Sequence, residues 1–210
     1  MSLPTIAPLL LPAYMPCPGF STACAKMRWA PQEGHVPRGF CGALGDPAQV
    51  RLVLVVAEPG DPHDSEAHPV APPADVLESI HHYAYHCFRD GHDLFHRNIR
   101  KILNLCFPDL TFEQQMHVSW ITESVLCSAK AEGAPVPVSV ATECRRRYLE
   151  PQLQAFPNAV VVALGSKAVN RLAGWSNVVT AFAAAPPGCN FKGAEESWRA
   201  AAEKVRARMG

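Results

Sequence analysis

Short apolar runs separated by helical patterns dominate the chain after its first 48 residues. The runs are rich in β-branched side chains and are closed by turn signals, which is typical of strands buried on both faces of a sheet. Strands that alternate with helices favour a parallel sheet with right-handed crossovers. We therefore expect an α/β fold, a single domain over residues 1–210, with a mostly parallel four-stranded sheet flanked by helices. The four predicted strands are residues 49–57, 117–125, 159–164 and 178–182.

Helical spacing of apolar residues fills the segments between these strands. Asp75 is a candidate cap for the first helix, and Gly91 is expected to end it. Thr111, with Gln114 three residues later, fits a capping box. Ser139 is a candidate cap for a later helix, which Pro151 is expected to kink or end. The predicted helices are residues 75–90, 94–106, a short one after 111, 139–153, 167–172 and 194–208.

The first 45 residues differ from the rest because they are rich in Pro, Gly and Cys and show no sustained period. We predict that this segment is irregular and is held in place by something other than a hydrophobic core.

Composition excludes several classes of protein. Hydrophobic residues make up 48% of the 210 residues, so the chain can bury a core. The 19 Lys and Arg balance the 19 Asp and Glu, which excludes a surface that is basic throughout but leaves room for a local basic patch. No apolar run approaches the ~20 residues of a membrane span, and residues 6–11 are short for a signal peptide. We expect a cytoplasmic, monomeric protein that does not bind a membrane.

Ligands of parallel sheets bind at the carboxyl ends of the strands. Those ends lie after Ala57, around Glu123, after Leu164 and after Phe182. We therefore expect the functional residues in these segments.

Four short motifs cluster around these strand ends. They read LVVAEPG over residues 54–60, WITESVLC over 120–127, CRRRYLEPQL over 144–153 and VVVALGSKA over 160–168. In this order and spacing the motifs resemble those of the uracil-DNA glycosylase superfamily, nearest its iron–sulfur branch. An ordinary nucleotide-binding α/β domain can also show the last motif and the strand with its Glu-Pro-Gly turn.

The resemblance implies an enzyme that flips a damaged or modified base out of DNA and hydrolyses its glycosidic bond. Glu58 stands at the motif position that activates water in much of this superfamily. A carboxylate there can stabilise an oxocarbenium-like sugar and orient the attacking water. No lysine stands out as a Schiff-base nucleophile, so we expect a monofunctional DNA glycosylase that leaves an abasic site. The alternative for Glu58 is an ordinary polar residue of a surface turn.

The same resemblance places base-binding residues around Glu58. Gly60 stands where the uracil-specific branch has a bulky side chain, so it leaves room for a modified pyrimidine. Glu123 replaces an asparagine that reads uracil. An ionised carboxylate only accepts hydrogen bonds and favours an exocyclic amino group, such as that of a C5-modified cytosine. A protonated carboxyl group can also donate a hydrogen bond, so with this alternative uracil remains a possible target base. The implied base-binding residues are Ala57, Pro59, Gly60, Val70, Glu123 and Asn190, with Val70 at a position where the family has a stacking aromatic residue.

The loop over residues 184–192 stands where the resemblance expects a histidine that supports the leaving base, and it contains none. Asn190 or Lys192 can supply a hydrogen-bond donor instead, and Phe191 can fill the gap left by a flipped base. The implied DNA contacts are Gly165, Ser166, Lys167, Phe191 and Lys192. The chain's 9 histidines follow no ligand pattern, and we interpret most of them as solvated or structural.

Four of the 8 cysteines match the cluster ligands of the iron–sulfur branch in position, although Cys17 stands upstream of the usual place. The resemblance implies that Cys17, Cys24, Cys127 and Cys144 hold a 4Fe–4S cluster. Zinc in the same four-cysteine site and four unrelated buried thiols are the alternatives.

The resemblance implies that the partner is DNA and that the activity is nucleoid-associated, of the bacterial type. Two other functions stay open. The missing histidine is compatible with a DNA-binding module that retains the fold without catalysis. The strand-end chemistry is also compatible with a hydrolase of free nucleosides.

Overall fold

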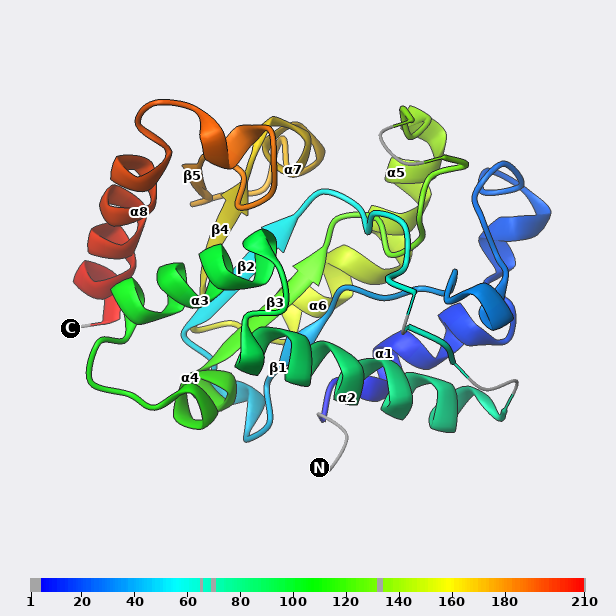
Figure 1. Ribbon diagram of the computed structural model, residues 1–210, viewed down its shortest axis with the longest axis horizontal. Helices are drawn as coiled ribbons and strands as arrows, with labels where there is room; N and C mark the ends of the chain where they lie inside the picture. The colour runs from blue at the N-terminus through cyan, green and yellow to red at the C-terminus, as the bar shows by residue number, and fades with distance from the viewer. Residues whose placement is uncertain (1–4, 65, 69–70, 132–133, 210) are drawn as a thin grey trace.

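A mixed β-sheet forms the centre of the computed structural model, which describes residues 5–64, 66–68, 71–131 and 134–209 (Figure 1). Within these residues the sheet has five strands in the order β1-β3-β2-β4-β5. β3, β2, β4 and β5 are parallel, and β1 runs antiparallel to β3. The strands are β1 (Cys41–Gly42), β2 (Leu52–Val56), β3 (Ser119–Glu123), β4 (Val160–Leu164) and β5 (Val179–Ala181).

The predicted α/β class is confirmed, but the prediction of four strands was wrong. The additional strand β1 comes from the segment that we expected to be irregular, and it pairs Cys41 with Ile121 and Gly42 with Trp120. Gly42 has a φ of 108°, and a Cβ there would lie 2.2 Å from the Ser119 carbonyl oxygen. Glycine therefore permits this close approach. A two-residue strand is too short to show a period of its own.

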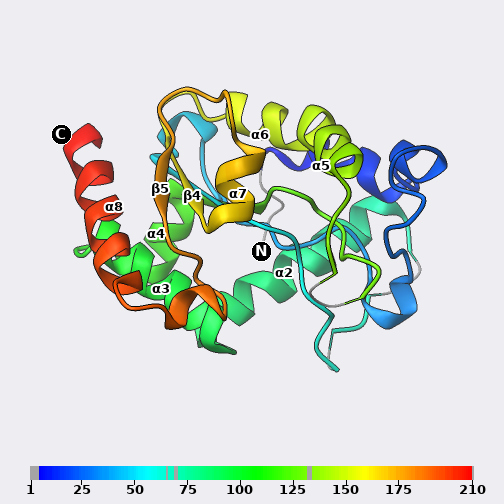
Figure 2. The same ribbon diagram turned by 90° about the horizontal axis from the view of Figure 1, so that it is seen from above.

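Helices cover both faces of the sheet (Figure 2). Alternate residues of the strands point to opposite faces, so Leu52 and Leu54 pack under α3 and α8 whereas Val53 and Val55 pack on the other face, near α1 and α5. Among the described helices, none is both long and apolar enough to cross a membrane. The helices are α1 (Ala7–Leu10), α2 (Pro73–Asp90), α3 (Leu94–Cys106), α4 (Phe112–Val118), α5 (Val138–Cys144), α6 (Glu150–Gln154), α7 (Ser166–Arg171) and α8 (Ala194–Met209).

The ends of the helices test the expected caps. The Thr111 capping box is present at the start of α4, and Gly91 ends α2 in the left-handed conformation. Asp75 and Ser139 do not cap their helices, because α2 and α5 begin earlier, directly after prolines. Prolines favour these starts because they fix φ near its helical value.

Of our two expectations for Pro151, that it ends the helix was wrong, because α6 continues to Gln154. A π-helical turn over Arg145–Leu149 joins α5 to α6, and Pro151 lies in the first turn of α6. The wider turn removes the clash that a proline ring makes with the carbonyl group one α-helical turn earlier.

The N-terminal segment is also more ordered than the sequence predicts. It contains α1 and short 3-10 turns over Leu11–Tyr14, Pro18–Ser21 and Pro31–Glu33. Leu10 is fully buried in the same core as Val53. Part of this segment is therefore held by hydrophobic packing, contrary to the expectation that something else fixes it.

Candidate functional site

A cavity of about 560 Å³ opens at the carboxyl ends of the parallel strands. Val56, Glu123 and Leu164 reach it as the last residues of β2, β3 and β4. α2 and α3 form its other walls. The remaining sequence-predicted residues that line it are Ala57, Glu58, Pro59 and Gly60. The cavity therefore brings together most of the predicted base-binding residues.

Glu58 lines this cavity with a side chain that is only 8% exposed. Arg171 Nη1 lies 2.6 Å from its Oε2, and Lys167 Nζ forms an ion pair with its Oε1. The same Arg171 guanidinium donates to the Ala57 carbonyl oxygen at 2.7 Å and to Ser124 Oγ at 3.0 Å. Arg171 therefore fixes both the carboxylate and the turn that carries it.

Glu123 lies in the same cavity and is buried, 6% exposed. Its Oε2 has no hydrogen-bond partner among the described residues. Burial and the nearby charge of Glu58 raise the pKa of Glu123 well above its ordinary 4.5, although Arg38 and Arg171 act in the opposite direction. The raised pKa favours the protonated form of this carboxyl group, which can donate one hydrogen bond and accept another. The structure therefore favours the protonated alternative for Glu123 over the acceptor-only one.

Glycine at position 39 makes room for this carboxyl group. Gly39 has a φ of 85°, and a Cβ there would lie 2.3 Å from Cγ of Glu123. Any larger residue would push Glu123 out of its place at the end of β3.

No pattern in the sequence indicated Arg38, which contacts the turn after β2 from the N-terminal segment. Its side chain is 7% exposed and forms an ion pair with Glu66 at 3.3 Å. It donates to the Gly60 carbonyl oxygen at 2.5 Å and to Ser128 Oγ at 3.0 Å. Ser128 Oγ also donates to the Gly60 carbonyl oxygen, at 2.9 Å. Two donors thus hold the end of the Glu58 turn.

Three of the 9 histidines also line the cavity. They are His63, His92 and His96. Asp93 Oδ1 lies 2.9 Å from Nδ1 of His96. Burial acts to raise the pKa of Asp93, but the hydrogen bonds from His96 outweigh it and lower that pKa to about 2.

Other predicted residues lie elsewhere. Asn190 and Phe191 line a separate surface depression beside α3 and α8, whereas residues 183–185 of the same connection line the main cavity. Lys192 and Ser166 are exposed, and Gly165 precedes α7 with a φ of 88°. Val70 lies outside the described residues.

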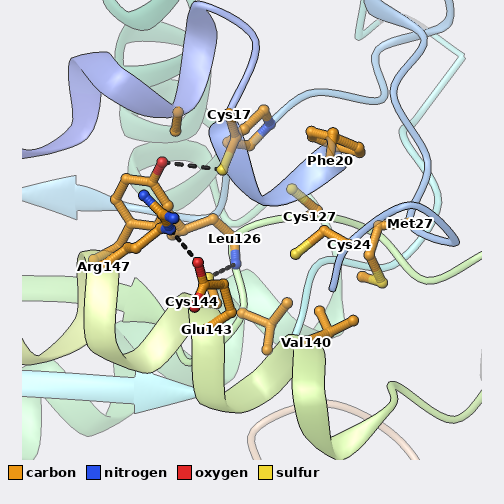
Figure 3. Close-up of a pocket in the computed structure, with 14 residues that line it drawn as sticks. Cys17, Phe20, Cys24, Met27, Leu126, Cys127, Val140, Glu143, Cys144 and Arg147 are labelled. Carbon is orange, nitrogen blue, oxygen red and sulfur yellow. Dashed lines mark hydrogen bonds and ion pairs between the residues drawn. The ribbon is translucent and has the colours of Figure 1, made fainter. Parts of the chain in front are cut away.

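The four predicted ligand cysteines line a second, buried cavity (Figure 3). Cys17 precedes the turn over Pro18–Ser21, Cys24 follows it, Cys127 lies in the loop after β3, and Cys144 ends α5. Their sulfur atoms surround a common space in Figure 3. Segments far apart in sequence thus bring the four thiols to one place.

Hydrogen-bond donors already face two of these sulfurs. The backbone N–H of Gly19 donates to Cys17 Sγ and that of Leu126 donates to Cys144 Sγ, each at 3.4 Å. Tyr148 Oη donates to Cys17 Sγ at 3.1 Å. Donors of this kind stabilise metal-bound thiolates and tune clusters.

Burial disfavours the thiolate form of these cysteines when no metal group is bound. Burial and the neighbouring Cys17 raise the pKa of Cys24 to about 11. Burial is also the main reason that the pKa of Cys144 is raised to about 12 and that the pKa of Cys127 is raised well above its ordinary value. A metal group would therefore have to displace protons when it binds.

The donor set, four thiols that line one cavity of about 10 Å³, is chemically suited to both zinc and a 4Fe–4S cluster. Within the described ranges, no group of three or more His, Cys, Asp or Glu side chains forms a ready site for one metal ion. Zinc needs all four sulfurs at about 2.3 Å from one centre, whereas each iron of a 4Fe–4S cluster takes its own cysteine.

Comparison with protein-family models gives no match to this chain, and comparison with curated proteins gives none either. The fold defines an α/β protein with a ligand cavity at the carboxyl ends of its strands. Function is therefore inferred from the two cavities and from the chemistry of their side chains.

Proposed function

We propose that this protein is a monofunctional DNA glycosylase with a uracil-DNA glycosylase-like fold. It would excise a damaged or modified pyrimidine and leave an abasic site. One observation carries the proposal: Glu58 and Glu123, from the ends of the adjacent strands β2 and β3, line one cavity of about 560 Å³. Such a cavity is large enough to receive an extruded base, which lies outside its stack during excision.

Glu58 supplies the chemistry of bond cleavage. As the glycosidic bond breaks, positive charge develops on the sugar, and a nearby carboxylate stabilises that charge. The same group orients the attacking water and accepts its proton. Arg171 keeps the carboxylate in place through its 2.6 Å contact, because its own position is fixed by Ala57 and Ser124.

Glu123 selects the base. A neutral carboxyl group presents one donor and one acceptor, as the amide of an asparagine does. It can pair with the carbonyl and N–H edge of uracil or, turned over, with the amino and ring-nitrogen edge of cytosine. Gly60 also lines the cavity and adds no side chain there, which favours pyrimidines that carry a substituent at C5.

Lys167 connects the site to the DNA backbone. Its side chain is 48% exposed while it pairs with Glu58. Exposed ion pairs are weak, about 0–1 kcal/mol, so a DNA phosphate can take over the ammonium group when DNA binds. This exchange would leave Glu58 held by Arg171 alone and accessible to water.

The four-cysteine cavity would hold a 4Fe–4S cluster through Cys17, Cys24, Cys127 and Cys144. When bound, the cluster would serve as a structural cross-link with no part in hydrolysis. It would join the N-terminal segment to α5 and to the loop after β3, which is the loop that carries Glu123.

Oligonucleotides that contain uracil, cytosine or a C5-modified cytosine test the proposal. Alkali breaks the strand at an abasic site, so we expect cleavage with the wild type and a loss of ~10²–10⁴-fold in Glu58→Gln. Glu78→Gln, an exposed acid on α2, is the control and should keep full activity. DNA that is bound but intact with every base would instead support a binding module. Release of bases from free nucleosides without DNA affinity would support a nucleoside hydrolase.

A further inference from the structure

We propose that His96 is the general acid that protonates the departing base. This inference rests on the proposed glycosylase function and adds a residue to it. Its basis is a histidine–carboxylate pair, His96 with Asp93, in the wall of the cavity that also contains Glu58 and Glu123.

The reaction needs such a group. The base leaves with the electron pair of the glycosidic bond, so negative charge develops on the base while Glu58 acts on the sugar and the water. The loop after β5 offers only the alanines 183–185 to the cavity, and alanine side chains cannot donate a proton. A donor must therefore come from another wall.

Asp93 fixes the orientation of the His96 ring. Asp93 is the N-cap of α3 and its Oδ1 accepts the backbone N–H of His96 at 2.9 Å. The same oxygen lies 2.9 Å from Nδ1 of the ring. Because a carboxylate only accepts hydrogen bonds, Nδ1 carries the proton. Nε2 is then the nitrogen with which the ring can reach a ligand.

Packing holds the ring in this position. The Phe88 ring centroid lies 4.6 Å from that of His96, and the Phe95 centroid lies 5.1 Å away. Asn98 Nδ2 donates to the Ala184 carbonyl oxygen at 2.8 Å, which ties α3 to the loop after β5. The His96 side chain is 18% exposed. It is therefore rigid but open to a bound molecule.

The step balances as follows. The bond between C1′ and the base breaks, and its electron pair moves into the base. The imidazolium of His96 gives its Nε2 proton to the base oxygen, which makes the leaving group neutral. Water adds to C1′ and gives its proton to Glu58. Glu58 then gives its proton to solvent, and solvent returns a proton to Nε2 of His96.

Leaving-group dependence separates this role from a structural one. Single-turnover rates would be measured with uracils whose C5 substituents range from methyl to strongly electron-withdrawing groups. We expect His96→Gln to lose ~10²–10³-fold on the poorest leaving group and progressively less on better ones, because a stable anion needs less proton transfer. Asp93→Asn keeps an N-cap residue but removes the negative charge, and should show a smaller loss with the same trend. His82→Gln, an exposed residue on α2, should match the wild type.

The outcomes distinguish the two proposals. An active wild type with an unchanged His96→Gln, or with a loss that is equal for all bases, would overturn the role of His96 alone. A wild type that cleaves none of the bases would overturn the glycosylase function itself. If His96→Gln is unfolded by circular dichroism, Asp93→Asn decides, because a leaving-group trend equal to that of the wild type contradicts the proposal.

Discussion

Replacement of Arg38 by methionine tests how the N-terminal segment supports the candidate site. The guanidinium is buried and contacts Glu66, Ser128 and the carbonyl oxygen of Gly60. Methionine keeps much of the apolar volume but removes the charge and all four polar contacts, which include a hydrogen bond to the Gly34 carbonyl oxygen at 3.3 Å. Among the described residues, the Glu66 side chain, 10% exposed, would then keep its contact with His68 at 3.4 Å.

The expected cost is large because one partner of a buried ion pair disappears. Such a change typically destabilises a protein by about 3–5 kcal/mol, since the remaining charge stays buried without compensation. For a chain of this size each kcal/mol lowers Tm by about 2–4 °C. We therefore expect Tm to fall by roughly 6–20 °C. Activity should fall as well, because Gly60 loses one of its two donors.

Urea unfolding and thermal melts measure this loss. Arg199→Met is the matched control: its ion pair with Glu195 is on the surface of α8, and the Arg199 side chain is 56% exposed. That pair is expected to contribute about 0.3–0.5 kcal/mol. The reasoning is refuted if Arg38→Met costs less than ~1 kcal/mol or no more than Arg199→Met.

Three further predictions concern titration and the cysteines. The pKa of Glu123 is raised above 4.5 in the folded state, so its stabilising contribution is complete below that pH and is lost as pH rises. Relative to Glu123→Gln, the wild type should lose up to about 1.4 kcal/mol per pH unit above 4.5 in urea unfolding; a difference independent of pH would contradict this. Burial lowers the pKa of His81 from 6.5 to about 4. The free energy of unfolding of the wild type should therefore fall by about 3 kcal/mol relative to that of His81→Gln as pH falls through that range. Parallel curves of unfolding free energy against pH for the two proteins would contradict this prediction. Protein purified without oxygen should absorb near ~400 nm; Cys24→Ser and Cys144→Ser should lose both the absorbance and the iron, Cys189→Ser should keep them, and a colourless wild type reconstituted with iron and sulfide would exclude the cluster.

Local signals predicted the elements whose pattern is complete within a few residues. The apolar runs ending near Val56 and Leu164 are strands because each is buried on both faces, and Thr111 and Gln114 cap α4 through neighbouring atoms. The strand β1 escaped prediction because it pairs with Trp120 and Ile121, which lie far along the chain. The π-helical turn before Pro151 likewise gives no pattern that a sequence can show.

The residues of the candidate site likewise include some that the sequence could predict and some that it could not. Glu58 and Glu123 share a cavity because parallel neighbouring strands end at the same edge of a sheet, which their positions in the sequence already indicate. Arg38 and His96 could not be assigned in this way. Arg38 lies in a segment that shows no hydrophobic period. His96 was not predicted because its position beside the loop after β5 and in the wall of the cavity exists only in the folded chain.

The loop after β3 links the two cavities, so a group bound in the cysteine cavity can influence the candidate site. Glu123, the last residue of β3, lines the main cavity, and Cys127 in the loop lines the other. Ser124, directly after Glu123, donates from Oγ to the Ala57 carbonyl oxygen at 2.5 Å. Ser128, directly after Cys127, donates from Oγ to the Gly60 carbonyl oxygen at 2.9 Å. The two serines therefore hold both ends of the turn that presents Glu58. A group bound to Cys127 would restrict this loop, so the order of the N-terminal segment and the geometry of the catalytic turn would be coupled through a few hydrogen bonds.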